Sequence, residues 1–376
     1  MVFVTGIGLV TALGPTAAVS WSRLLGGNSG IQLRQPFADL SVRPLAMVGK
    51  HPAELSDILS QAVSEALKDA GLTPPLPDCG VVIGSSRSFQ GAWERAGQEW
   101  LDHGQLPAGA DWLMTLPHMG AIATARQIGA TGAVLAPMAA CATGLTAIFQ
   151  GYELIRRGHC HQVIAGAGEA PITPLTLAGF ERLGALANTG CYPFDPFREG
   201  LVLGEGAAVL VLESAASLVQ RPSVQPYGRI LGAGLSANAY HRTAPDPGQR
   251  GSRLALAACL RHSGLTPGAI GYVHTHGTGT ALNDAHEAIL LSEALPQPAA
   301  SSTKGATGHT LGASGAIGAA LTLLALRDQT LPPNVGWRGK SIYPALVTEA
   351  TALAFDTALC VSFGFGGQNA VLALGR

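Results

Sequence analysis

The run Ala-Pro-Met-Ala-Ala-Cys-Ala-Thr-Gly-Leu-Thr-Ala-Ile occupies residues 136–148, and a related run, Ala-Ser-Gly-Ala-Ile, recurs at residues 313–317. Each run lies at or near the start of a helical stretch, 143–157 or 312–327, and the residues of these stretches are small and apolar almost all the way round the helix. A helix of this kind is typical of a protein interior rather than of a surface. The two runs therefore predict a pair of central helices, one in each half of the chain.

Further segments match between the two halves, and they do so in the same order along the chain. Residues 4–9 resemble 230–235, residues 66–74 resemble 259–267, and residues 208–212 resemble 370–374. Single pairs of this length arise by chance in a chain rich in Gly and Ala, but several pairs in register indicate an internal repeat. The pattern predicts two homologous halves, residues 1–220 and 221–376.

Each half alternates apolar strand-like runs with helical stretches, which predicts an α/β fold built from parallel βαβ units. The strands at 162–167 and 207–212 are apolar on both faces, so helices should cover both sides of each sheet. With the central helices placed between two sheets, the sequence predicts five layers, αβαβα.

Composition excludes several classes of function. Of 376 residues, 47% are hydrophobic and 12% are charged, and the net charge of −1 provides no basic field for nucleic acid. The longest strongly apolar run, 315–326, is too short to span a bilayer, and no signal-peptide pattern opens the chain, so no membrane association is expected. Six cysteines without framework spacing favour a cytoplasmic protein.

Cys141 falls where a strand-like run turns into the first central helix. The unpaired N–H groups of a helix N-terminus favour a thiolate, which is a nucleophile. His276 follows an apolar strand, and Lys304 and His309 stand just ahead of the second central helix. Because the repeat sets the two helix starts opposite each other, we expect the cysteine and both histidines to converge. The glycine-rich run 362–370 could add backbone N–H donors and a movable aromatic side chain.

Other motifs are weaker. The sequence His159-Cys160-His161 has no distant second cluster of the kind a zinc site needs. Gly6 and Gly8 lack the third glycine of a dinucleotide-binding turn, and Gly339-Lys340-Ser341 lacks the first glycine of a P-loop. We therefore expect no metal and no bound nucleotide.

The runs around Cys141, at 276–280, at 304–309 and at 364–367 resemble those of the β-ketoacyl-acyl carrier protein synthases. These are the condensing enzymes of fatty acid and polyketide synthesis, and the resemblance extends from about residue 2 to 374. It implies a thiolase-like fold of five αβαβα layers. It also implies decarboxylative condensation of an enzyme-bound acyl group with malonyl-acyl carrier protein, which yields 3-ketoacyl-acyl carrier protein.

The resemblance also implies residue roles. Cys141 would be the nucleophile, His276 and His309 would stabilise the enolate, Lys304 would orient His309, and Phe365 would gate the acyl pocket and share an oxyanion hole with the Cys141 N–H. The substrate-binding residues implied are Thr278, Thr280, Asp284, Gly366 and Gly367. Met138, Ile148 and Phe149 are expected to line the acyl pocket. No cofactor is implied beyond the phosphopantetheine arm of the acyl carrier protein, and a homodimer is expected.

One departure from the family pattern concerns the chemistry. Many members carry a glutamate nine residues after the second histidine, where this chain has Gly318. A decarboxylating initiation factor or a chain-length partner subunit is therefore an alternative. A thiolase-like enzyme acting on coenzyme A esters is another, with Cys360 as its second cysteine, and a Cys-His hydrolase is a third.

Overall fold

The computed structural model describes residues 1–105 and 111–376. Within these residues, ten strands form one mixed sheet. In spatial order the strands are β10 (Ala299–Ser301), β9 (Tyr272–His274), β13 (Thr357–Gly364), β14 (Gln368–Gly375), β8 (Gly228–Ala237), β1 (Val2–Thr11), β7 (Gly206–Ser214), β6 (Gln162–Glu169), β4 (Gly80–Gly84) and β5 (Val134–Leu135). Two short ribbons lie outside it: β2 (Gln32–Arg34) with β3 (Arg43–Leu45), and β11 (Thr330–Leu331) with β12 (Thr351–Ala352).

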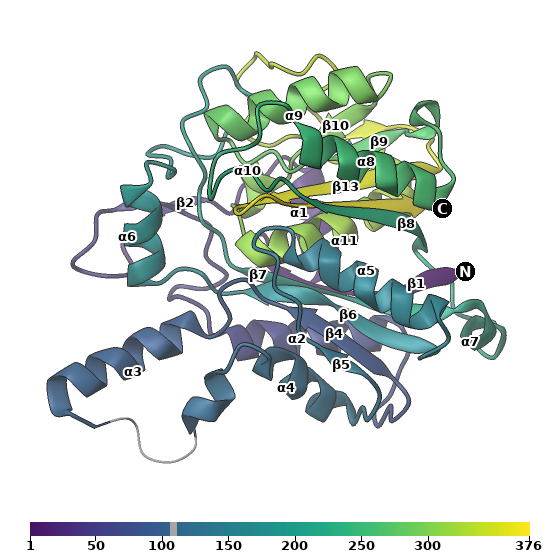
Figure 1. The fold of residues 1–376 in the computed structure, drawn as a ribbon, viewed down its shortest axis with the longest axis horizontal. Coiled ribbons are helices and arrows are strands. Elements are labelled where there is room, and N and C mark those ends of the chain that lie inside the picture. Colours follow the sequence, from purple (N-terminus) through teal and green to yellow (C-terminus); the bar gives the residue numbers. More distant parts are fainter. Residues whose placement is uncertain (106–110) are drawn as a thin grey trace.

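Helices lie on both faces of this sheet, and further helices lie beside it (Figure 1). They are α1 (Ala17–Leu25), α2 (Leu55–Asp69), α3 (Gln90–His103), α4 (Met119–Ile128), α5 (Thr143–Arg156), α6 (Pro174–Arg182), α7 (Ala215–Val219), α8 (Arg250–Ser263), α9 (Ala281–Ala294), α10 (Lys304–Thr307) and α11 (Ser314–Asp328). Short 3-10 turns occur at η1 (Asp111–Thr115), η2 (Pro267–Ala269) and η3 (Leu311–Ala313).

The layers follow the repeat in the sequence. In Figure 1, α5 and α11 lie between the strands of the two halves, α2 and α4 cover one outer face, and α8 and α9 cover the other. Separate apolar clusters fill the central layer and the two outer interfaces. The predicted five-layered α/β fold is therefore confirmed.

The strand pairing repeats as well. From β1 outward the order is β7, β6, β4, β5, and from β8 outward it is β14, β13, β9, β10. In each half the two innermost pairings are antiparallel and the two outer ones are parallel. The expected parallel βαβ pairing is therefore found among the outer strands, whereas the inner strands pair antiparallel. The halves also join, because Val2–Val4 of β1 pairs with Gly228–Ile230 of β8.

The central helices approach each other closely because their contact residues are small. A Cβ atom at Gly144 of α5 would lie 2.4 Å from the backbone nitrogen of Ala316 in α11, so only glycine fits there. The segment Leu311–Asp328 is long and apolar enough to cross a membrane, with a mean hydropathy of 1.2, but 89% of it is buried within the fold. Its apolar character is explained by its place between the two halves of the sheet.

Candidate active site

Four segments meet around a cavity of about 340 Å³. Cys141 lies just before α5, His276 follows β9, His309 lies between α10 and η3, and Phe365 occupies the turn between β13 and β14. All four side chains line the cavity, together with Thr278 and Thr280. The repeat thus brings together, from distant parts of the chain, the cysteine and the two histidines that the sequence singled out.

The backbone around Cys141 is held from several sides. Ala140, the residue before Cys141, has a φ of 47°, which a non-glycine residue adopts at a cost. The Ser362 hydroxyl donates a hydrogen bond to the Cys141 carbonyl at 2.7 Å, and the Thr143 hydroxyl accepts one from the Ala139 N–H at 2.8 Å. The backbone N–H of Phe365 acts on the Cys141 thiol as a donor that lowers its pKa. Strain at such a position is characteristic of a functional group that the fold aims in one direction.

The two imidazoles are set nearly at right angles, with ring centroids 5.3 Å apart and an interplanar angle of 83°. One side-chain atom each from Cys141, His276 and His309 lie within 4.8 Å of one another. The Ser314 hydroxyl is 2.8 Å from Nδ1 of His309 and fixes the orientation of that ring. Nδ1 of His276 is buried and has no hydrogen-bond partner among the described residues. Thiol and imidazole groups also bind metal ions, so the expected absence of a metal stays a prediction.

Burial dominates the electrostatics of the site. It raises the pKa of the Cys141 thiol to about 11, although the Lys304 charge and the Phe365 N–H act in the opposite direction. Burial, followed by the charge of Lys304, holds the pKa of His276 and of His309 well below the usual value. At neutral pH the resting site therefore holds a thiol and two neutral imidazoles. This direction is opposite to the expected thiolate, because desolvation outweighs the Lys304 charge and the Phe365 N–H.

Lys304 supports the site in a different way from the one expected. Its buried ammonium group donates a hydrogen bond to the backbone carbonyl of His276. The expected orientation of His309 by Lys304 is therefore corrected, since the contact on the His309 ring comes from Ser314. Burial lowers the pKa of Lys304, and the neighbouring Glu287 partly offsets that effect.

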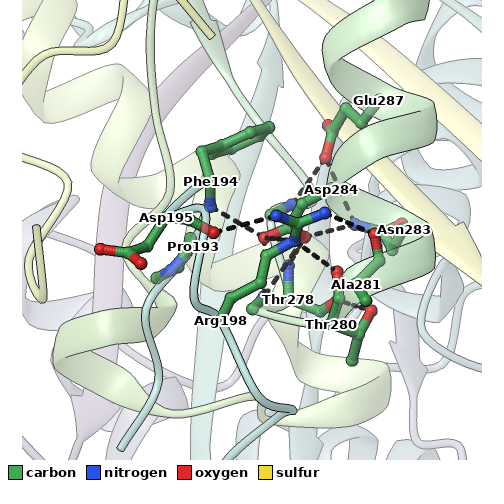
Figure 2. A network of polar contacts seen from close by, with 12 residues as sticks. Pro193, Phe194, Asp195, Arg198, Thr278, Thr280, Ala281, Asn283, Asp284 and Glu287 are labelled. Atoms are coloured by element: carbon green, nitrogen blue, oxygen red, sulfur yellow. Dashed lines mark hydrogen bonds and ion pairs between the residues drawn. The ribbon is translucent and has the colours of Figure 1, made fainter. Parts of the chain in front are cut away.

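Asp284 is buried outside the cavity lining, so the structure gives no support to its predicted role in binding substrate, which stays a prediction. The side chain is fully buried and accepts hydrogen bonds from the N–H groups of Phe194 at 2.8 Å and Thr278 at 3.0 Å. Figure 2 shows this network, in which Arg198 lies 3.8 Å from the carboxylate and donates to the Thr280 carbonyl. Asp284 is absent from the cavity lining, and it acts by fixing the loop that follows His276.

The other predicted substrate-binding residues divide into two groups. Thr278 and Thr280 line the cavity with hydroxyls 2.9 Å apart, and Gly367 lines it too. The N–H of Gly366, by contrast, donates to the Arg242 carbonyl at 2.8 Å, and Gly366 does not line the cavity, so its predicted contact with substrate is not supported. Phe365 is 40% exposed, and its ring centroid lies 6.0 Å from that of Phe180, a position from which it can cover the cavity.

The expected acyl-pocket residues lie outside this cavity. Met138 is 55% exposed, Ile148 is buried in the central core, and Phe149 stacks on Tyr152. Cys360 also lies outside it, behind His274, with its sulfur 3.8 Å from the imidazole. A second cysteine therefore does not face Cys141, which weighs against the thiolase-like alternative.

Two supporting carboxylates were missed by the sequence reasoning. Glu287 accepts hydrogen bonds from the N–H groups of His276 and Gly277, both at 2.7 Å, and burial raises its pKa to about 7. Glu169, at the end of β6, accepts from the Ser85 hydroxyl at 2.7 Å and the Gly312 N–H at 2.9 Å, so it ties the two halves together beside Cys141. The one available signal was an acidic residue at the end of an otherwise apolar strand.

Comparison with known proteins identifies the family. The model of the β-ketoacyl synthase N-terminal domain matches residues 50–217, and that of the C-terminal domain matches residues 227–338. The 3-oxoacyl-[acyl-carrier-protein] synthase 2 of Synechocystis is 33% identical over 404 residues, covering 99% of this chain and 97% of that protein. The chain belongs to the β-ketoacyl synthase family. The corresponding Staphylococcus aureus protein is 32% identical over 409 residues, with 99% and 97% coverage.

Solved structures of β-ketoacyl synthases have the same fold. One from Burkholderia phymatum is 28% identical with a TM-score of 0.91, and the match covers 100% of this chain and 99% of that one. A solved complex of a type II PKS acyl-carrier protein with its ketosynthase contains a chain that is 26% identical to this one, with a TM-score of 0.92. The match covers 100% of this chain and 99% of that one. This β-ketoacyl synthase is therefore an acyltransferase with the condensing function of fatty acid or polyketide synthesis. The division at residue 220 stays a prediction.

Proposed function

We propose that Cys141 carries the growing acyl chain and that His276 and His309 stabilise the enolate formed from the malonyl thioester. The observation that carries this proposal is the meeting of these three groups within 4.8 Å in one cavity, with the Phe365 N–H acting on the thiol as a donor. Preorganised donors in a buried site stabilise developing negative charge strongly, because they do not reorganise during the reaction.

The first half-reaction transfers the acyl group. The Cys141 thiol, whose pKa is about 11, gives its proton to a neighbouring neutral imidazole as the sulfur attacks the thioester carbonyl. The N–H groups of Cys141 and Phe365 receive the oxyanion. The bond to the carrier's sulfur then breaks, and the departing thiolate takes up the proton. The acyl group is left on Cys141.

The second half-reaction consumes the malonyl thioester. Its bond to the carboxylate carbon breaks and releases carbon dioxide, and the electron pair forms an enolate whose oxygen accepts hydrogen bonds from His276 and His309. The enolate carbon attacks the Cys141 thioester, and the Cys141 sulfur leaves as a thiolate that takes up one proton from solvent, so each condensation consumes one proton. Neutral imidazoles suit this step, because each retains an N–H to donate.

We further propose that the substrates arrive on an acyl carrier protein and that no other cofactor takes part. Thr278 and Thr280 face the cavity, where their hydroxyls can bind the amides of a phosphopantetheine arm. The similar type II PKS ketosynthase was solved with its acyl-carrier protein, which supports the same class of partner here. All six cysteines are free thiols, in keeping with the reducing conditions of the cytoplasm.

A second copy of the chain is the proposed partner at the open edge of the sheet. β5 forms that edge, and Leu135 and Met138 beside it are 38% and 55% exposed. An unpaired edge with apolar neighbours favours association. Sedimentation should show a homodimer, which Leu135→Asp disrupts and Leu254→Asp, at an exposed position of α8, leaves intact. A monomeric wild-type protein would overturn this proposal.

Intact-mass analysis tests the chemistry. Wild-type protein mixed with acyl-acyl carrier protein should gain the acyl mass, and addition of malonyl-acyl carrier protein should remove it and yield 3-ketoacyl product. Cys141→Ala should show neither event, whereas Cys79→Ala, at a buried cysteine outside the cavity, should behave as wild type. An adduct without condensation would favour the transfer-only or initiation alternative, and no adduct would overturn the role of Cys141.

A further inference from the structure

The space above Gly318 is filled by a histidine that the mechanism does not use. Gly318 lies in α11, and a Cβ atom placed on it would be 2.7 Å from both Cε1 and Nδ1 of His274 and 2.9 Å from the sulfur of Cys360. Contacts this short do not occur for real side chains, so any residue larger than glycine requires the imidazole to move. The His274 ring therefore takes the space that a side chain at position 318 would need.

His274 is held rigidly in this place. It is the last residue of β9 and is 2% exposed. Its Nε2 lies 3.0 Å from the hydroxyl of Thr303, and its Nδ1 lies 3.8 Å from the sulfur of Cys360. Burial, followed by the charge of Lys304, lowers the pKa of His274 to about 3, so the ring is neutral.

The contact to Thr303 connects His274 with the catalytic groups. Thr303 immediately precedes Lys304, the first residue of α10, and the Lys304 ammonium donates to the backbone carbonyl of His276. The side chain of Glu287 accepts a hydrogen bond from the N–H of His276 at 2.7 Å. The imidazole of His276 is thus fixed through its own backbone, and His274 supports one of the two groups that fix it.

We propose that His274 is a positioning residue: through its contact with Thr303 it holds Lys304 against the backbone of His276. This inference rests on the proposed role of His276 in stabilising the enolate.

The test separates the two half-reactions. His274→Ala should lower carbon dioxide release from malonyl-acyl carrier protein by about tenfold to a hundredfold, since a displacement near 1 Å can cost that much. Acyl transfer to Cys141, followed by intact mass, should fall less than decarboxylation, because Lys304 contacts His276 directly and acts on Cys141 only through its charge. His274→Gln keeps a neutral amide near Thr303 and should retain more decarboxylation than His274→Ala. His262→Ala, at a histidine of α8, serves as the control for losing an imidazole.

A second pair of variants tests the packing of His274 against Gly318. Gly318→Glu alone should impair decarboxylation severely, because the new side chain collides with the His274 ring. The double variant His274→Ala/Gly318→Glu should decarboxylate faster than either single variant, since the smaller residue frees the space. Melting temperatures measured alongside identify any variant that fails to fold, in which case the comparison of His274→Gln with His274→Ala decides.

Two results would overturn the inference. One is an equal loss of acyl transfer and decarboxylation in His274→Ala, which would make the residue merely structural. The other is decarboxylation by His274→Ala at the wild-type rate. If the wild-type protein itself forms no adduct and releases no carbon dioxide, it is the proposed function that fails, and the two failures are thereby distinguished.

Discussion

Replacing Asp284 by Asn tests whether this carboxylate is structural. The substitution keeps the shape of the side chain, so it creates no cavity. An amide has only one acceptor oxygen, however, whereas the carboxylate oxygens receive the N–H groups of Phe194 at 2.8 Å, of Thr278 at 3.0 Å and of Gly279 at 3.2 Å. At least one buried N–H then loses its acceptor, and Arg198 loses its buried counter-charge at 3.8 Å.

The expected cost follows from these two losses. An unpaired buried donor costs about 1–3 kcal/mol, and breaking a buried ion pair costs about 3–5 kcal/mol, with part of that range shared between the two effects. We take about 4 kcal/mol for the change in the free energy of unfolding. An unfolding entropy of roughly 2.1 cal/mol/K per residue gives about 0.8 kcal/mol/K for this chain, so the melting temperature should fall by about 5 °C.

Differential scanning calorimetry measures the stability, and steady-state condensation measures the KM for malonyl-acyl carrier protein. Asp57→Asn, at an exposed position of α2, is the matched control and should melt within about 1 °C of wild type. At a temperature where Asp284→Asn is folded, its KM should equal that of the wild type. A variant that melts like wild type but has a raised KM would refute the structural assignment and restore the role in binding substrate.

Three further results are expected. Alkylation of Cys141 by iodoacetamide should accelerate about tenfold per pH unit between pH 7 and 10, because its pKa of about 11 keeps the thiol protonated. A plateau of the rate below pH 9 would contradict this pKa. Lys304→Met should slow the alkylation at every pH, since the loss of the positive charge raises the pKa of Cys141. Phe365→Ala should speed alkylation at fixed pH by uncovering the cavity, and an unchanged rate would argue against a gate. Gly144→Ala should destabilise the protein by about 1–3 kcal/mol by forcing the central helices apart, whereas Gly97→Ala, with open space at the Cβ position, should be neutral or stabilising in calorimetry.

The layers of this fold could be predicted because the sequence repeats what the packing requires. Gly6 and Gly232 are equivalent in the repeat, and a Cβ at either would collide with the backbone of the helix packed on its strand, α2 or α8. The strand directions could not be predicted in the same way. Apolar strands that are buried on both faces have the same composition whether their neighbours run parallel or antiparallel. The sequences of β7 and β14 therefore did not reveal that these strands pair antiparallel with β1 and β8.

The reacting groups were predictable for a related reason. Cys141, His276 and His309 stand at the ends of apolar segments, and the repeat fixes which of those ends meet. Their supports were less visible, because a buried carboxylate such as Glu287 is recognisable only from the N–H groups that surround it. Lys304 shows the same limit: its position near the site followed from the sequence, but its partner turned out to be a backbone carbonyl, which every residue possesses.

The expected thiolate of Cys141 is the prediction that differs most from the structure, and the physical reason applies to buried groups in general. A helix N-terminus stabilises a thiolate by a local interaction that sequence position reveals, whereas the cost of desolvation depends on how completely the fold closes over the sulfur. Here Cys141 is 8% exposed, and the cost of desolvation raises the pKa of its thiol to about 11. In the proposed mechanism the thiolate therefore forms during the reaction, through proton transfer to a neutral imidazole. The same burial that raises the pKa of Cys141 lowers the pKa of His276 and of His309, so both rings keep an N–H for the proposed enolate.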